Sequence, residues 1–362
     1  MNNKNRNIAL DIFRILVMFM IVMGHFLFHG GVIKNAPLFS VSYFSSNFLM
    51  SFLNVHVNCF VLLSGYFIST KQFRLDKVLE LWLQIFFWSI TLYMVIIMLQ
   101  GGAFEPKELI KSLMPFTQQR YWFMTTYLLM YFMTPFLNIS ISTLTKKQYK
   151  LVLSVYFIIF ICFQNIIVWR NFTSVSASDP LFFCFLYMIG AYLRKYPIKK
   201  KIPWFWIYVV CCLITSGSKF IITGITLSIF GEPIGETLFS GYCSITNVIG
   251  AVALFIVFVN LKIYINPKVG KWITRISTLT LGVYLIHDHT NVRTYIWNLF
   301  QPSSYIGSGI LFFVLIIDSV VIFSICCVLE WARQKIFEVT GINKVIFRFG
   351  NKIVDGVKKT VL

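Results

Sequence analysis

The first long apolar segment of the chain, residues 8–28, carries three ionisable residues: Asp11, Arg14 and His25. Arg14 and His25 are 11 residues apart, and at 100° per residue this spacing exceeds three full helical turns by about 20°. We therefore expect both side chains on one face of a helix, roughly 16 Å apart along its axis. Asp11 lies three residues before Arg14 and can pair with it. A polar stripe thus runs through an otherwise apolar helix.

This stripe has the residue types of acid–base chemistry combined with anion binding. Histidine acts as a general base near neutral pH, whereas arginine stays protonated and holds anionic or carbonyl oxygen atoms. The structural alternative is an Asp11–Arg14 ion pair and a satisfied histidine near the outer headgroups. His25 and His29 are one helical turn apart, a spacing that can bind zinc, but no further ligand pattern accompanies them. We therefore expect no metal.

Several other apolar segments carry polar residues as well. An ionised group near the centre of a bilayer costs about 2.5 to 3.5 kcal/mol on insertion scales, so polar groups within spans are expected to face a common interior. The polar residues concerned are Asn54, His56 and Asn58, the run Ser64-Gly65-Tyr66, and Tyr284 with His287 three residues later.

The composition determines the class of protein that must position these side chains. Of the 362 residues, 57% are hydrophobic and only 12% are charged, whereas a soluble domain is about 25% charged. A soluble enzyme, a disordered chain and a disulfide scaffold are therefore excluded. Apolar runs of about 18 to 25 residues recur along the chain, each long enough to cross a bilayer as a helix. The sequence predicts an all-α polytopic integral membrane protein.

We expect ten spans, and the basic residues between them indicate their orientation. The expected inner segments hold 24 Lys and Arg residues and the outer ones six, so both termini are predicted to be cytoplasmic. The net charge of +19 then reflects topology, and we expect no nucleic-acid partner. The predicted spans are Ile8 to Phe28, Phe44 to Ile68, Glu80 to Leu99, Tyr121 to Ile141, Leu151 to Val168, Leu181 to Leu193, Pro203 to Ile222, Ser244 to Leu261, Ile276 to Trp297 and Ile306 to Glu330.

Residues 1–330 are interpreted as a transmembrane domain and residues 331–362 as a basic, amphipathic cytoplasmic tail on the anionic inner leaflet. A short outer helix is expected over Glu105 to Met114, and Thr223 to Cys243 is the longest expected outer loop.

Four motifs together resemble the signatures of the membrane-bound acyltransferase 3 family, and the resemblance extends over essentially all ten spans. They are Asp11-Ile-Phe-Arg14 with His25 after ten further residues, the run from Phe60 to Ser64-Gly65-Tyr66, Tyr121-Trp122-Phe123, and Tyr284-Leu-Ile-His287. The resemblance implies transfer of an acyl group, most often acetyl from acetyl-CoA, to hydroxyls of cell-surface or exported carbohydrates. Relatives often have arginines entering the third span, where this chain has Lys77 and Glu80.

The combined interpretation assigns roles to particular residues. His25 is the predicted base, Arg14 binds the donor and Asp11 orients Arg14. A covalent route, in which His25 activates Ser64 or a tyrosine, stays open. The predicted acyl-CoA contacts are Arg14, Ser64, Gly65, Tyr66 and Lys77, and the predicted acceptor contacts are Tyr284, His287 and Trp122. For His287, the alternative that it orients His25 stays open.

The expected partners are therefore acyl-CoA, a glycan acceptor, the lipid bilayer of the cell membrane and, as an open alternative, a second copy of the chain. The rival function is that of a secondary transporter or flippase, because intramembrane charges such as Lys219 and Asp318 also mark transport paths. Against it, the sequence shows no internal repeat and no paired Gly or Pro interruptions.

Overall fold

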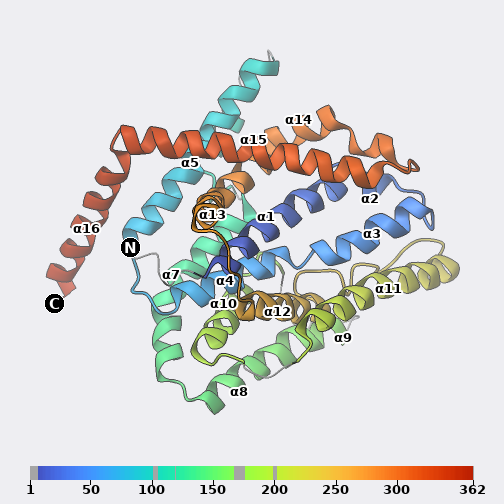
Figure 1. Ribbon diagram of the computed structural model, residues 1–362, viewed down its shortest axis with the longest axis horizontal. Coiled ribbons are helices and arrows are strands. Elements are labelled where there is room, and N and C mark those ends of the chain that lie inside the picture. The colour runs from blue at the N-terminus through green and yellow to red at the C-terminus, as the bar shows by residue number, and fades with distance from the viewer. Residues whose placement is uncertain (1–6, 101–104, 119, 167–175, 199–201, 362) are drawn as a thin grey trace.

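The computed structural model describes residues 7–100, 105–118, 120–166, 176–198 and 202–361, and all the regular structure in these ranges is helical (Figure 1). Five helical segments are long and apolar enough to cross a membrane: Ile8–Asn35, Val41–Ile68, Leu75–Leu99, Trp204–Phe230 and Leu311–Val339. The all-α, multi-pass class is thereby confirmed. The full set of ten spans and the side on which each terminus lies stay predictions.

The helices follow the order of the expected segments but are more numerous than the expected spans. In chain order they are α1 (Ile8–Phe28), α2 (Val32–Asn35), α3 (Val41–Leu53), α4 (His56–Ile68), α5 (Leu75–Gln100), α6 (Pro106–Leu113), α7 (Trp122–Thr143), α8 (Lys146–Tyr156), the π-helix η2 (Phe157–Cys162), α9 (Phe163–Ile166), α10 (Pro180–Lys195), α11 (Trp204–Phe230), α12 (Ile245–Asn260), α13 (Pro267–His287), α14 (Thr290–Phe300), the 3₁₀-helix η3 (Pro302–Tyr305), α15 (Leu311–Val339) and α16 (Ile342–Val361).

Helix α1 lies inside the bundle, where it packs against α13, α15 and α4 (Figure 1). Its start is fixed by Asn7, whose side-chain oxygen accepts a hydrogen bond from the N–H of Ala9. Because apolar residues such as Phe13, Val17 and Val22 are completely buried among these neighbours, the polar stripe of α1 is held within the protein and not against lipid.

The second predicted span is two helices, which corrects the expectation of one continuous helix from Phe44 to Ile68. Helix α3 ends at Leu53 and α4 begins at His56. At the break, the side chain of Asn54 donates to the carbonyl of Ser240, and the hydroxyl of Tyr208 donates to the carbonyl of Phe52 over 2.6 Å. These tertiary partners take up polar groups that an unbroken helix would satisfy internally.

The ninth predicted span is also interrupted, although it was expected to run unbroken from Ile276 to Trp297. Helix α13 ends at His287, because His289 has extended backbone angles (φ −58°, ψ 129°) and α14 begins only at Thr290. Both breaks leave helix ends and polar side chains beside α1, where a continuous apolar helix would present neither.

Other boundaries differ from the prediction. Helix α11 runs to Phe230, so the outer loop expected from Thr223 begins at Gly231. Helix α15 starts at Leu311, five residues later than predicted, because the segment before it turns at Gly307 (φ +81°). The short helix expected near Glu105 and the helix after residue 342 are present as α6 and α16, while the side of the membrane on which each lies stays a prediction. Val168, the predicted end of the fifth span, lies outside the described residues, as do Lys199, Lys200 and Lys201.

A buried ion pair ties α15 to α5 and α13. Glu330 is completely buried; it accepts from the indole N–H of Trp88 over 2.8 Å and from the guanidinium of Arg333 over 2.6 and 2.9 Å. A methyl group on Gly282 of α13 would overlap the Glu330 side chain. Glycine at this position therefore allows α15 to approach the helix that carries His287.

Candidate functional site

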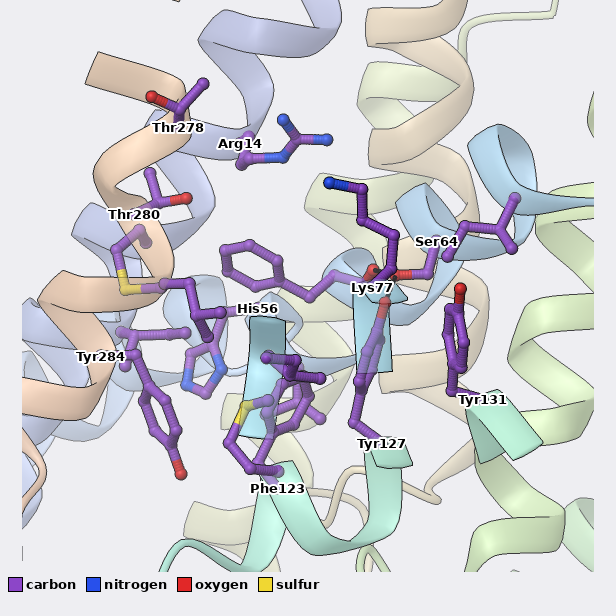
Figure 2. Close-up of a pocket in the computed structure, with 18 of the residues that line it drawn as sticks. Arg14, His56, Ser64, Lys77, Phe123, Tyr127, Tyr131, Thr278, Thr280 and Tyr284 are labelled. Carbon is purple, nitrogen blue, oxygen red and sulfur yellow. Dashed lines mark hydrogen bonds between the residues drawn. The ribbon is translucent and has the colours of Figure 1, made fainter. Parts of the chain in front are cut away.

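A cavity of about 500 Å³ runs along the polar face of α1 (Figure 2). This size is within the usual range for a small-molecule site. As the helical spacing predicts, Arg14 and His25 both line it. Arg14 and Lys77 lie towards one end in Figure 2, and Tyr284 and Phe123 lie towards the other.

One end of the cavity is basic. Arg14 from α1, Lys77 from α5, and Lys71 and Arg74 from the connection before α5 all line it. Arg74 also pairs with Asp76, and Lys77 pairs with Glu80 over 2.5 Å. Guanidinium and ammonium groups gathered in one cavity suit a ligand with several negative charges. Lys71 and Arg74 were missed as site residues, although their position just before the third span was a usable signal.

At the other end, two histidines form a relay that sets the tautomer of His25. His287 is completely buried, and its Nδ1–H donates to the carbonyl of Val283 over 2.6 Å. Its Nε2 must then accept, and it accepts from the Nδ1–H of His25 over 3.0 Å. Nε2 of His25 is consequently left unprotonated, on a side chain that remains 16% exposed. The cavity therefore contains a histidine already prepared to take a proton.

Charged groups adjoin this pair of histidines. Oδ1 of Asp288 lies 3.6 Å from Nδ1 of His25 and 3.9 Å from Nε2 of His29, so that His25, His29 and Asp288 present the donor types of a metal site within 4.8 Å of one another. However, the guanidinium of Arg293 lies 3.2 Å from Asp288 and 3.4 Å from His29. Arg293 thus supplies the positive charge that a metal ion would bring, and the arrangement favours an ion pair.

Aromatic side chains form the wall near His25. Trp122 and Tyr242 are stacked, with ring centroids 6.0 Å apart and planes inclined by 25°, and His56 lies 5.5 Å from Tyr242. All three residues line the cavity, as does Tyr284. An aromatic wall with a few polar groups beside it is typical of sites for small polar organic ligands.

The family model described as the acyltransferase domain, Acyl_transf_3, matches residues 7–329. The chain belongs to the membrane acyltransferase 3 family. No curated protein and no solved structure matches it. We therefore assign the roles of individual residues in this acyltransferase from the geometry of its cavity.

Four of the predicted site residues line the cavity of the acyltransferase in addition to Arg14 and His25. Ser64 and Lys77 belong to the predicted donor contacts, and Trp122 and Tyr284 to the predicted acceptor contacts. The hydroxyl of Ser64 bonds the carbonyl of Phe60 and lies 3.3 Å from the hydroxyl of Tyr127. Its bonds include none to a histidine, which disfavours Ser64 as a nucleophile activated by His25.

Two predicted donor contacts do not line the cavity. Gly65 packs against α10, because a methyl group there would overlap the backbone of Tyr187. Tyr66 packs against Phe255 and under the guanidinium of Arg194. The Ser-Gly-Tyr run thus positions α4 by close helix packing.

Asp11 and His287 lie behind the cavity wall of the acyltransferase. Asp11 is 3.8 Å from Arg14, and it also accepts hydrogen bonds from Ser277 over 2.8 Å and Thr274 over 3.3 Å. It therefore joins α1 to α13 as well as facing Arg14. His287, predicted to contact the acceptor or to orient His25, is fully buried and contacts His25. His56 was noted only as a polar residue of the second span, yet it lies on the wall.

Proposed function

We propose that this acyltransferase moves a short acyl group, in the simplest case acetyl, from acyl-CoA to a hydroxyl of a cell-surface or exported carbohydrate. One observation carries the proposal: a single cavity joins a basic end at Arg14 to an unprotonated nitrogen at His25. A phosphorylated donor with a neutral, reactive far end matches this division of charge.

The donor is placed by its charges. The phosphates of coenzyme A bind to Arg14 and Lys77 at the basic end of the cavity, together with Lys71, which also lines it. Arg14 and His25 are separated by roughly 16 Å along α1, a length comparable to an extended phosphopantetheine arm. The thioester of a coenzyme bound at the basic end consequently reaches the neighbourhood of His25.

The acceptor occupies the aromatic end. The apolar face of a sugar ring packs on the wall formed by Trp122 and Tyr242, and its hydroxyls lie among His56, Tyr284 and His25. Nε2 of His25 takes the proton of one hydroxyl as that oxygen attacks the thioester carbon. His25 then returns the proton to the departing sulfur, so that the products are the carbohydrate ester and free coenzyme A.

The test uses inverted membrane vesicles from the native cells, supplied with acetyl-CoA labelled in the acetyl group. We expect label in the glycan fraction and an equal amount of free coenzyme A thiol. His25→Gln keeps a hydrogen-bonding side chain but removes the base, so transfer should fall by about 10²- to 10⁴-fold. Arg14→Lys keeps the charge but loses the planar fork, and it should raise the KM for acetyl-CoA without loss of folded protein.

His29→Gln is the matched control, because His29, the C-cap residue of α1, follows His25 by four residues and does not line the cavity. It should transfer acetyl at close to the wild-type rate. Near-normal transfer by His25→Gln would remove His25 as the base. Wild-type vesicles that neither bind nor consume acetyl-CoA would favour the transporter interpretation.

A further inference from the structure

Two buried side chains on the cavity wall each carry a polar atom without a regular hydrogen bond within the described part of the chain. Tyr284 is 5% exposed and its hydroxyl has no regular hydrogen bond; His56 is 2% exposed and its Nδ1 has no hydrogen-bond partner. The carboxylate of Asp288, which also lines the cavity, is the nearby group that interacts with the Tyr284 hydroxyl, at a geometry short of a regular hydrogen bond. An unsatisfied buried polar group costs about 1 to 3 kcal/mol, so two of them on one cavity wall indicate a ligand that they bind.

A helix start meets the cavity at the same place. His56 and Val57, the first two residues of α4, line the cavity. No side chain caps this helix, because Val55 stands at the N-cap position. The carbonyl of Phe52, which an unbroken helix would pair with the N–H of His56, accepts from Tyr208. The 13-residue helix α4 thus directs its positive end, with unpaired first-turn N–H groups, to the site.

These donors flank the proposed base. A methyl group on Gly24 would lie 3.7 Å from Nε2 of His56, so His56 packs on α1 one residue before His25. Tyr284 precedes His287 by one helical turn, with the two rings 6.4 Å apart. His287 in turn holds His25 at 3.0 Å. Figure 2 shows Tyr284 and His56 on the same side of the cavity, away from Arg14.

We propose that the Tyr284 hydroxyl, together with His56 and the start of α4, is the oxyanion-binding site for acyl transfer. This inference rests on the proposed function. As the acceptor oxygen bonds to the thioester carbon, the carbonyl π electrons move onto the carbonyl oxygen. The O–H of Tyr284 and the N–H of neutral His56 donate to that oxygen. When the C=O bond re-forms, the C–S bond breaks, and the sulfur leaves with its electron pair and takes the proton from His25.

Neutral, preformed donors in a cavity within the membrane domain are suited to this task. Electrostatic stabilisation of a developing oxyanion is worth most where water is excluded and the donors need no reorganisation. The resting protein leaves these donors without a regular hydrogen bond, and the transition state supplies the missing acceptor. The lack of a regular hydrogen bond at Tyr284 before reaction is thus an expected property of such a site.

The test is Tyr284→Phe, measured in the same vesicles by release of coenzyme A thiol. We expect kcat to fall by about 10²- to 10³-fold, as for removal of one oxyanion donor, with little change in the KM for acetyl-CoA. The thermal unfolding temperature should not fall, because the lost hydroxyl makes no regular hydrogen bond in the resting protein. His56→Gln, which keeps an N–H donor, should retain more activity than His56→Leu.

Tyr121→Phe is the control for a purely structural effect. The Tyr121 hydroxyl donates to the carbonyl of Leu285 over 2.9 Å, next to Tyr284 on α13, and Tyr121 does not line the cavity. This variant should lose stability and keep its kcat, the reverse of Tyr284→Phe. A wild-type kcat in Tyr284→Phe, a change confined to KM, or a loss of activity that tracks a lower unfolding temperature would each overturn the inference.

Failure of the proposed function has a different signature. In that case the wild-type vesicles release no coenzyme A from acetyl-CoA, and the oxyanion assignment falls with the reaction. An active wild type with an equally active Tyr284→Phe variant overturns the oxyanion assignment alone and leaves acyl transfer intact.

Discussion

At the scale of single residues, the proposed reaction requires the proton of His25 to be on Nδ1, so that Nε2 can accept the proton of the acceptor hydroxyl. The carbonyl of Val283 fixes the proton of His287 on Nδ1, and His287 in turn fixes that of His25 on Nδ1. His287 is completely buried and does not itself line the cavity. In the proposed reaction it is a positioning residue that acts through His25.

Replacing His287 tests this role. His287→Leu removes the acceptor of the His25 Nδ1–H, so we expect a fall in kcat of at least about 10-fold and a changed pH–rate profile, with KM for acetyl-CoA little altered. His287→Gln retains an acceptor oxygen and should restore part of the activity. The measurement is kcat against pH per amount of folded protein. Equal activity of the leucine and glutamine variants, both with the wild-type pH profile, would show that His287 only fills space.

The sequence predicts contacts along one helix better than contacts between helices. The shared face of Arg14 and His25 follows from helical periodicity, because α1 is unbroken from Ile8 to Phe28. The position of His56 on the cavity wall depends on how its helix packs against other helices. The spacing of residues in the sequence does not reveal this packing. The same holds for Asp11, whose bond to Ser277 joins positions 266 residues apart.

At the scale of elements, the two broken spans position the site. The α13–α14 break coincides with a polar run, Asp288 to Asn291, whereas the α3–α4 break has no such run. No Gly or Pro lies at the α3–α4 junction. The break instead depends on Asn54 bonding to Ser240, 186 residues later. A sequence pattern that predicts apolar length therefore finds the span and misses its interruption. The helix ends that result supply polar groups at membrane depth, next to a cavity.

The Glu330 ion pair is the element-scale feature that holds α5, α13 and α15 together. Glu330→Gln leaves the charge of Arg333 buried without its counter-charge, and breaking a buried pair costs about 3 to 5 kcal/mol. We expect a clearly lower thermal unfolding temperature in detergent. Glu338→Gln on the same helix breaks an exposed pair with Lys335, which solvent screens, and should leave the unfolding temperature nearly unchanged. Equal unfolding temperatures of the two variants would contradict a stabilising role of the Glu330–Arg333 ion pair.

At the scale of the whole molecule, the basic end of the cavity and the terminal helix lie on the same side. Gly350 of α16 packs against Asp76 at the start of α5, beside Lys77 (Figure 1). The exposed side chains of α16 include Lys344 and Arg348. This gathering of positive charge agrees with the cytoplasmic side that the distribution of Lys and Arg predicts, and acyl-CoA is present on that side.

The orientation is testable by cysteine labelling from outside intact cells. Cys243, beside the outer loop, is only 7% exposed, because it packs within the bundle, so it is a poor target for an impermeant thiol reagent despite its position in the sequence. Glu232 in the outer loop and Lys147 at the start of α8 are both exposed and make better sites. We expect Glu232→Cys to react in intact cells and Lys147→Cys to react only after permeabilisation, each against the wild-type background. The reverse pattern would show that the protein has the opposite orientation, with Arg14 and Lys77 on the outer side, where no acyl-CoA reaches them. The donor assignment would then fail together with the orientation.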